Sequence, residues 1–443
     1  MQCSVTIMVE LAPEADVSQM EEAIQEAGRQ AMRAALAQAV RGYEGAHAAC
    51  PHCGGEHSQG QGTVARRVLT RFGRVVLRLR RQRCGACGRR FRPAQGCLAG
   101  LAGGNVTPEL GAACALVGVS WAYATAAHVL QTLCGAQVSA EEVRHWTNRL
   151  GDAEAQAQQA EAERLLTPTA EQVRQERDAQ VRRERRGECN APAPPARLVV
   201  GLDGGWLPSR EQRGGMEGKI GVVATGSEPV GKRGRHRLTP RRYVATFGDS
   251  NQVGALAYAA ATALGGEAAP KQLVLGDGAA WIKTQADRHF PAALGILDWA
   301  HVARALHKTI RAARPGRAQQ ETRRALHQTL PDLLWHGDLD ATLAALRALR
   351  PAAPAEPIPL LEQTRRYLEG QRAWLGDYAA WQQQGYPVGS GLIERAVAIV
   401  INWRMKGRGM RWCRANASAV VALRVRTLNA SWASDDEVLP LVA

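Results

Sequence analysis

The sequence lacks any apolar run approaching the roughly 18–20 residues of a membrane span. Residues 1–10 are mildly apolar, but they have no basic start, no long apolar core and no small-residue cleavage site, so we expect no signal peptide. Cysteine is also sparse: the chain has ten cysteines in 443 residues, and four of them form two Cys-x-x-Cys pairs. In a chain without export signals, such pairs favour metal binding over disulfides.

Acidic residues are outnumbered by basic ones, which gives a net charge of +15 and a pI of about 9.8. A charge of this sign and size is frequent in nucleic-acid-binding proteins. The length predicts two to four domains with ample core, and the hydrophobic content of 45% fits a globular protein. The sequence contains no evident internal repeat.

Three acids carry the clearest chemical signal. Asp203 and Asp277 each end an apolar run and lead into glycine, and Glu394 lies in the first turn of an expected helix that Ser390 could cap. Each acid also has a purely structural interpretation. Asp-Gly is a common turn pair, and an acid near a helix N-terminus stabilises the helix without any further function. Together they suit a site for two Mg²⁺ or Mn²⁺ ions that catalyse phosphoryl transfer.

The elements around these acids predict an α/β domain. Short apolar runs indicate strands, and helical spacing indicates the helices between them. We expect strands at 197–203, 219–225, 242–247, 272–276 and 294–298, a basic loop at 231–242, and helices at 251–264, 279–290 and 299–313. This order matches the ribonuclease-H-like fold, with the first acid on strand one, the second after strand four and the third on a later helix.

Asp298 and His301 form an Asp-x-x-His pair at a strand-to-helix turn. One interpretation is a helix cap and a surface histidine. The other places both beside the metal site, where they would steer a phosphate or support a ligand.

Two knuckles predict a zinc ribbon. The proposed ligands are four thiolates suited to one tetrahedral structural Zn²⁺: Cys50, Cys53, Cys84 and Cys87. His52 and His57 are possible substitutes, Cys97 is a weaker fifth ligand, and buried free cysteines are the alternative. Between the pairs, Val75, Leu77 and Leu79 alternate with Val76, Arg78 and Arg80, which predicts a hairpin that turns near Phe72 and Gly73.

From residue 64 to residue 92 the chain has 11 arginines and no acid. Such a hairpin, with Arg78 and Arg80 on its exposed face, is expected to hold DNA phosphates. A solvated charged surface is the alternative.

Residues 107–150 are compatible with a helix-turn-helix. Val119–Leu133 would be the first helix, ending near Gly135, and Ser139 would cap the second. The second helix would expose residues able to contact DNA: Arg144, His145, Thr147 and Asn148. An ordinary helical hairpin explains the pattern equally well.

Residues 395–430 contain eight basic residues and no acid. The expected DNA contacts in this segment are Arg404, Lys406, Arg408, Arg411 and Trp412. Trp403 and Trp412 could instead be core residues, and Gly407 to Gly409 is expected to form a loop.

These patterns divide the chain into eight segments. They are an N-terminal helical segment (1–45, helix at 17–41), a zinc ribbon (46–98), a helix-turn-helix-like segment (99–150), a charged helical linker ending in a proline-rich run (151–196), the first part of the catalytic domain (197–315), a helical insertion (316–384), the second part with Glu394 (385–430) and a tail (431–443).

The combination of motifs resembles the DDE transposases of bacterial insertion sequences, closest to the Kra-type group and related to the Mutator-like transposases. The resemblance extends from about residue 50 to residue 429. It is carried by Asp203-Gly-Gly, Gly-Asp277-Gly followed by Phe-Pro and Asp-x-x-His, Gly-Ser-Gly-x-Ile-Glu394, and Arg404-Met-Lys-Gly-Arg-Gly-Met-Arg-Trp412.

The resemblance implies a catalytic triad of Asp203, Asp277 and Glu394 that holds two Mg²⁺ or Mn²⁺ ions. It implies metal-dependent cleavage and strand transfer at the DNA ends of the element, by a homodimer or larger assembly in the bacterial cytoplasm, at the nucleoid. Two alternatives stay open: a non-catalytic sequence-specific DNA-binding protein, and a non-specific ribonuclease-H-like nuclease.

Overall fold

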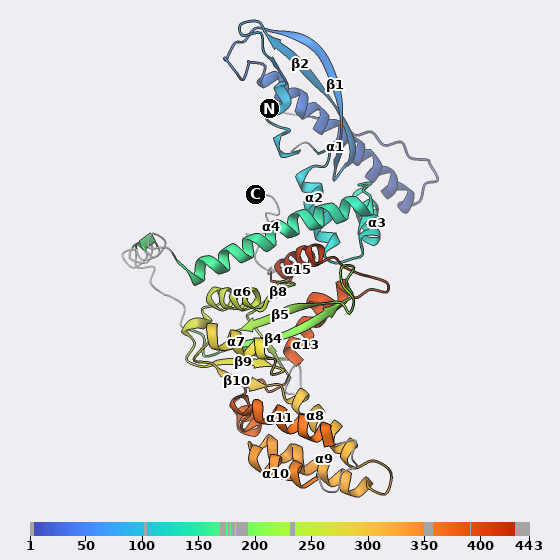
Figure 1. Cartoon of the computed structure of the whole chain (residues 1–443). Coiled ribbons are helices and arrows are strands. Elements are labelled where there is room, and N and C mark those ends of the chain that lie inside the picture. The colour runs from blue at the N-terminus through green and yellow to red at the C-terminus, as the bar shows by residue number, and fades with distance from the viewer. Residues whose placement is uncertain are drawn as a thin grey trace. The chain divides into compact units, whose positions relative to one another are not determined.

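The computed structural model describes residues 4–101, 104–168, 174–175, 178, 182, 194–230, 235–349, 358–389 and 391–429. The chain divides into two compact units, one built on Met1–Gly151 and the other on Asp152–Ser431 (Figure 1). The tail at 431–443, the start of the proline-rich linker and the proposed cap Ser390 lie outside the described residues. No helix in the described ranges is both long enough and apolar enough to cross a membrane.

The first unit begins with a helix on a small sheet. Helix α1 (Val17–Ala46) starts with a capping box between Asp16 and Gln19 and continues five residues beyond the expected end. Strands β1 (Ser58–Thr70), β2 (Gly73–Cys84) and β3 (Arg90–Phe91) form an antiparallel sheet in the order β1-β2-β3. The expected hairpin is confirmed, because every second residue from Gly73 to Leu79 is buried. Those inward residues pack with Val40 of α1.

Three helices follow: α2 (Pro108–Gly118), α3 (Tyr123–Cys134) and α4 (Ala140–Leu166). The expected helix Val119–Leu133 was wrong at its start, because Val119 ends α2 and a new helix begins at Tyr123. Ser139 does cap α4, accepting a hydrogen bond from the Glu142 backbone at 3.0 Å.

The prediction that Thr147 is exposed on α4 was also wrong. Thr147 is fully buried, and a Cβ on Gly118 would lie 2.1 Å from its Oγ1. Trp146 lies equally close to Gly111, so two glycines of α2 allow α4 to approach that helix closely. This face of α4 is therefore packed in the unit's own core.

The second unit is built on a five-stranded sheet. Its strands are β4 (Leu198–Leu207), β5 (Met216–Ala224), β8 (Arg241–Thr246), β9 (Gln272–Gly276) and β10 (Leu294–Leu297). Their order is β10-β9-β4-β5-β8, in which β4, β9 and β10 run parallel and β5 is antiparallel to both neighbours. A separate antiparallel pair is formed by β6 (Ser227–Val230) and β7 (Arg235–Leu238), and β7 lies within residues 231–242, which were expected to be a basic loop.

All five predicted strands are present, but the first is longer than expected. The parallel pairing of β4 with β9 ends at Gly201 and Leu275, whereas its antiparallel pairing with β5 continues to Leu207 and Met216. Asp203 therefore lies inside a strand that keeps one partner after losing the other, and only Asp277 follows the end of its strand.

Helices cover both faces of this sheet. On one face, Val200 and Leu202 pack with α6 (Ser250–Ala263) and α7 (Ala280–His289). On the other face, the buried side of β5 and β8 packs with α13 (Gly391–Val397), a π-helical turn (Ala398–Asn402) and α15 (Arg414–Asn429). The short α14 (Trp403–Met405) joins them.

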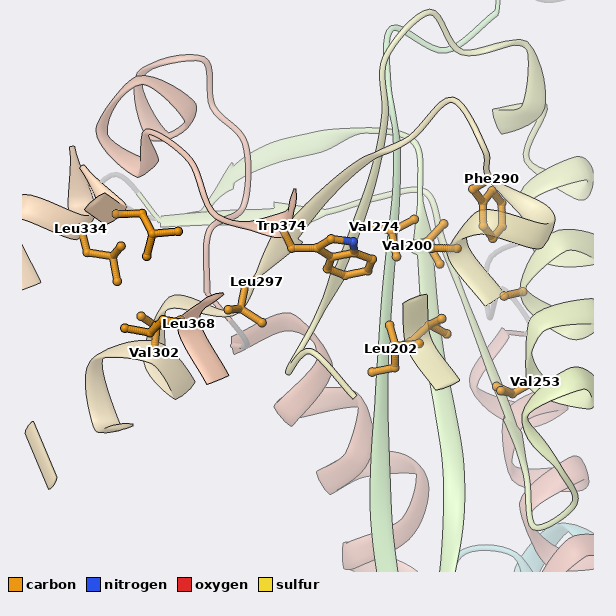
Figure 2. Packing of buried hydrophobic residues seen from close by; sticks show 14 of the residues in the cluster. Val200, Leu202, Val253, Val274, Phe290, Leu297, Val302, Leu334, Leu368 and Trp374 are labelled. Atoms are coloured by element: carbon orange, nitrogen blue, oxygen red, sulfur yellow. The ribbon is translucent and has the colours of Figure 1, made fainter. Parts of the chain in front are cut away.

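The described residues between 316 and 384 form helices that share the core of the sheet. They are α9 (Gln320–Trp335), α10 (Leu339–Leu349), α11 (Ile358–Gly370), a 3₁₀ turn (Arg372–Trp374) and α12 (Tyr378–Gln383), and they follow α8 (Trp299–Ala313). Leu334, Leu368 and Trp374 belong to the same buried cluster as Val200 and Val274 (Figure 2). The predicted insertion is therefore continuous with the hydrophobic core of the sheet.

Candidate active site and metal centre

Three aspartates lie just beyond the point where the parallel pairing of three adjacent strands ends. Gly201 pairs with Leu275, and Leu297 pairs with Gly276. When both registers are continued, Asp203, Asp277 and Asp298 fall side by side in one row. All three line a small pocket together with His301. Polar residues at the carboxyl ends of parallel strands are the usual components of ligand sites in α/β sheets.

Asp203 lies beneath α13. Side chains alternate along a strand, so Gly201 and Gly205 share its face. A Cβ on Gly201 would lie 3.5 Å from Cβ of Ile393, and a Cβ on Gly205 would lie 3.3 Å from Val397. The two glycines thus let α13 approach β4 on either side of the acid.

Glu394 follows Ile393 on this helix and is exposed. Its expected place in the first turn of a helix is confirmed. It does not line the pocket that holds the three aspartates and His301. The structure therefore brings Asp203 and Asp277 together, and carries Glu394 on the helix packed across the strand of Asp203.

The turn that carries Asp277 is held from both sides. Asp277 Oδ1 accepts a hydrogen bond from the Ala279 backbone at 2.9 Å. The hydroxyl of Tyr367 in α11 donates to the Asp277 carbonyl at 3.3 Å, and Nε2 of Gln371, just after this helix, donates to the Gly278 carbonyl at 2.9 Å. Gly278 has φ +87°, and a Cβ there would lie 2.6 Å from Gln371. Sequence reasoning missed Tyr367 and Gln371, because nothing local ties them to a turn about 90 residues earlier.

Asp298 and His301 form a hydrogen-bonded pair. Asp298 is buried and caps α8, with Oδ1 accepting from the Ala300 backbone at 3.0 Å. Its other oxygen contacts His301 Nδ1. That bond, then the charge of Asp298, raises the pKa of His301, which lies partly exposed in the pocket. The capping interpretation and the location in the pocket thus hold together.

Burial raises the pKa of Asp203 to about 6, and the nearby charge of Asp277 adds to this effect. Its Oδ1 accepts a hydrogen bond from the Gly204 backbone at 2.7 Å. A carboxylate that is costly to ionise beside other carboxylates is the kind of oxygen donor that a hard divalent cation compensates. The chemistry of Asp203 and Asp277 therefore fits Mg²⁺ or Mn²⁺.

Four cysteines form a compact centre in the first unit. Within the described ranges, Cys50, Cys53, Cys84 and Cys87 are the one group of three or more His, Cys, Asp or Glu whose candidate ligand atoms all lie within 4.8 Å of one another. The Sγ atoms of Cys50 and Cys87 are 3.7 Å apart, and those of Cys53 and Cys84 are 3.6 Å apart. This donor set fits one tetrahedral zinc ion.

The two knuckles repeat one backbone pattern. Cys50 and Cys84 each accept a hydrogen bond from a glycine four residues later, Gly54 at 2.9 Å and Gly88 at 3.0 Å, and both glycines have φ +72°. The backbone N–H of Cys87 lies 3.5 Å from Cys84 Sγ and lowers the pKa of this thiol to about 6.

The other proposed ligands do not join this centre. Cys97 Sγ donates to the Ala94 carbonyl at 3.2 Å, His52 lies beside Arg89, and the carbonyl of His57 accepts from Gly85.

The predicted DNA-contact role is contradicted for two residues of the C-terminal segment. Arg404 and Trp412 are buried, with the guanidinium 5.3 Å from the centre of the indole ring. Trp412 Nε1 donates to the Met405 carbonyl at 2.9 Å, and its backbone N–H donates to Pro208 at 3.0 Å. Trp412 joins this segment to the chain after β4, because its indole fills the core and its polar atoms have partners inside the protein.

The remaining proposed contact residues are accessible to different degrees. Lys406, Arg408 and Arg411 are exposed, as are Arg78 and Arg80 on the outer face of β2. Arg411 also donates to the Ser209 carbonyl at 3.1 Å. Arg144 is half-exposed and pairs with Glu141, and Asn148 is half-buried.

No family model matches the chain, and no curated protein matches its sequence.

Proposed function

We propose that this protein is a DDE-type DNA transposase that binds the ends of its own element and cuts and joins DNA with a divalent metal. The observation that supports this most is the grouping of Asp203, Asp277 and Asp298 at the ends of three adjacent parallel strands, in one pocket that the helix carrying Glu394 also lines. The strand order β10-β9-β4-β5-β8 also fits a ribonuclease-H-like sheet.

Asp203, Asp277 and Glu394 are the proposed ligands of Mg²⁺. The bound ions would activate water or a DNA 3′-hydroxyl for attack and stabilise the leaving 3′-oxygen. The chain's own task is to hold these carboxylates in fixed positions, since phosphoryl transfer depends mainly on positioning and charge. The core under Asp203 and the hydrogen bonds from Tyr367 and Gln371 to the Asp277 turn serve this purpose.

His301 is proposed to contact a phosphate oxygen of the DNA. Its bond to Asp298 fixes the ring and favours the protonated form, which donates a hydrogen bond and carries a positive charge. Asp298 then acts through His301 as a positioning residue.

The test incubates purified protein with Mg²⁺ or Mn²⁺ and DNA that carries the flanks of its own gene, beside an Asp203→Asn/Glu394→Gln variant. We expect breaks at fixed positions that the variant does not make. Binding without cleavage in the wild type would favour the non-catalytic DNA-binding protein. Cleavage at unrelated positions would favour the nuclease, and cleavage by the variant would refute the assigned site.

A further inference from the structure

The strongest unassigned feature is a concave pocket of about 760 Å³ in the first unit. It lies where β2 and β3 meet the 3₁₀ turns Pro93–Gln95 and Ala99–Leu101. We call it the arginine pocket, because four guanidinium side chains line it: Arg66, Arg81, Arg90 and Arg92.

Three of these arginines occupy the face of the sheet that elsewhere is apolar, and Arg92 directly follows β3. Val75, Leu77 and Leu79 alternate inward, and the next inward position of β2 is Arg81. Arg66 is paired with Leu77 across the hairpin and shares its face.

Arg90 pairs with Arg83, which places it on the same inward side. This face of the sheet is apolar at one end and arginine-rich at the other, and core packing does not account for the arginines.

A bulge in β1 opens this part of the sheet. The register shifts between Gly60 and Thr63, opposite the stretch of β2 that contains Arg81. Gln61, within the bulge, also lines the pocket. Bulges interrupt regular pairing and redirect side chains, and they are frequent beside binding sites.

The charges of the pocket have no acid among the residues that line it. Arg66 donates to the Gly104 carbonyl, and Arg81, Arg90 and Arg92 are exposed. Leu79 contributes an apolar wall, which reduces the screening of these charges. Converging guanidinium groups repel one another until an anion joins them, and their planar donors match phosphate oxygens.

We propose that the arginine pocket binds consecutive phosphates of a nucleic-acid backbone. Its arginines are spread over a wide, open concavity, whereas a small free phosphate needs a tight enclosure of buried donors. The surrounding segment, 11 arginines without an acid, extends the positive potential along the path of a polyanion. Such contacts give affinity and register without reading bases. The identification of the polyanion as DNA rests on the proposed function.

The experiment measures the affinity of a labelled random-sequence duplex by fluorescence anisotropy over about 50–300 mM salt, the range in which counterion release is evident. All proteins carry Asp203→Asn, so that cleavage is prevented without a chelator that would also remove zinc. The pocket variant is Arg81→Gln/Arg90→Gln. The matched control, Arg41→Gln/Arg149→Gln, removes two exposed charges of the same unit that lie outside the arginine-rich segment.

We expect the pocket variant to bind the duplex at least about tenfold more weakly than the parent protein. The slope of log affinity against log salt concentration should decrease in magnitude by about two, and both quantities should change much less in the control. Arg81→Lys/Arg90→Lys keeps the charge and should retain most of the slope. Zinc content and thermal melting verify that each variant is folded.

Equal effects of the pocket variant and the control would refute the pocket. Displacement of DNA by millimolar inorganic phosphate, beyond the effect of equal ionic strength, would reassign it to a small anion. A parent protein that binds no duplex would refute both the pocket and the proposed function. A further outcome is that duplex binding depends on the pocket but the protein with Asp203 intact cuts no DNA. That outcome would refute the catalytic proposal alone.

Discussion

The raised pKa of Asp203 predicts that the isosteric change Asp203→Asn stabilises the metal-free protein while abolishing cleavage. An unperturbed aspartate has a pKa of 3.8, and burial raises that of Asp203 to about 6. Asparagine removes the buried charge and keeps an oxygen that accepts the hydrogen bond from Gly204. It also removes the repulsion by Asp277.

The magnitude follows from linkage. A difference of one in pKa corresponds to about 1.4 kcal/mol, which sets an upper limit of roughly 3 kcal/mol for the cost of ionising Asp203 in the fold. Because the side chain is only half-buried, solvent screening reduces this to about 1–2 kcal/mol. For a unit of this size the gain in Tm is roughly 2–8 °C.

The pH dependence has a defined sign. The pKa of Asp203 is higher in the folded chain than in the unfolded chain, so protonation stabilises the fold. The benefit is fully present below about pH 4 and is lost as the pH rises through about 6. The advantage of Asp203→Asn should therefore be complete at pH 7.5 and absent near pH 4.

The assay is thermal unfolding of metal-free protein at both pH values, with and without added Mg²⁺. Glu394→Gln is the matched control, since Glu394 is exposed and its charge is screened, so that variant should lose cleavage without gaining stability. Mg²⁺ should raise the Tm of the wild type more than that of Asp203→Asn. An Asp203→Asn protein that is less stable than the wild type at pH 7.5, or equally stabilised at both pH values, would refute the reasoning.

Four further predictions concern the parts that support the site. Cys84→Ser should release the proposed zinc and unfold the ribbon, which a zinc assay and a melt of the first unit would detect, whereas an unchanged melt would argue against a structural metal. Gly205→Ala should lower the free energy of unfolding by about 1–3 kcal/mol, because its Cβ would lie 3.1 Å from Ile401. It should also slow cleavage by displacing α13, and an unchanged cleavage rate would show that the position of this helix does not affect catalysis. Gln371→Leu should lower kcat for cleavage with little change in DNA affinity, because it loosens the turn that carries Asp277, and a loss confined to affinity would contradict this role. Arg404→Gln should lower the Tm and leave the salt slope of DNA binding unchanged, since the residue is buried; a decrease of about one in that slope would restore it as a phosphate contact.

Local patterns in the sequence were enough to predict most of the strands and helices. Apolar runs located the five strands of the large sheet, and alternation located the hairpin with Val75 and Leu77 inward. The paired cysteines carried their own spacing, so their approach to within 4.8 Å was predictable. Periodicity and ligand spacing are patterns over few residues, and they can therefore be recognised in a single sequence.

The errors arose where distant packing decides. Thr147 was expected to be exposed and Arg404 to contact DNA, but both are buried, Thr147 against Gly118 of α2 and Arg404 beside Trp412. The extension of β4 beyond Asp203 depends on pairing with β5, which a strand's own composition does not reveal.

Packing between distant parts of the chain also explains why residues 316–384 were predicted to be an insertion. Its helices were read as a segment apart, yet Trp374 packs against β10 so closely that a Cβ on Gly295 would lie 2.5 Å from the indole ring. The helix that precedes Trp374, α11, also bonds to the turn of Asp277. Packing and positioning therefore come from the same segment.

This coupling bears on how a costly row of aspartates is maintained. Three neighbouring carboxyl groups repel one another, and the half-buried Asp203 destabilises the fold when it ionises. The cost is offset by the core that α9, α10 and α11 extend beyond the sheet. A chain cut before α9 would lose both the packing around Trp374 and the hydrogen bonds to the Asp277 turn. The helices between Asp277 and Glu394 thus support the candidate site through their packing and hydrogen bonds. This supporting role accounts for the long interval between the two acids.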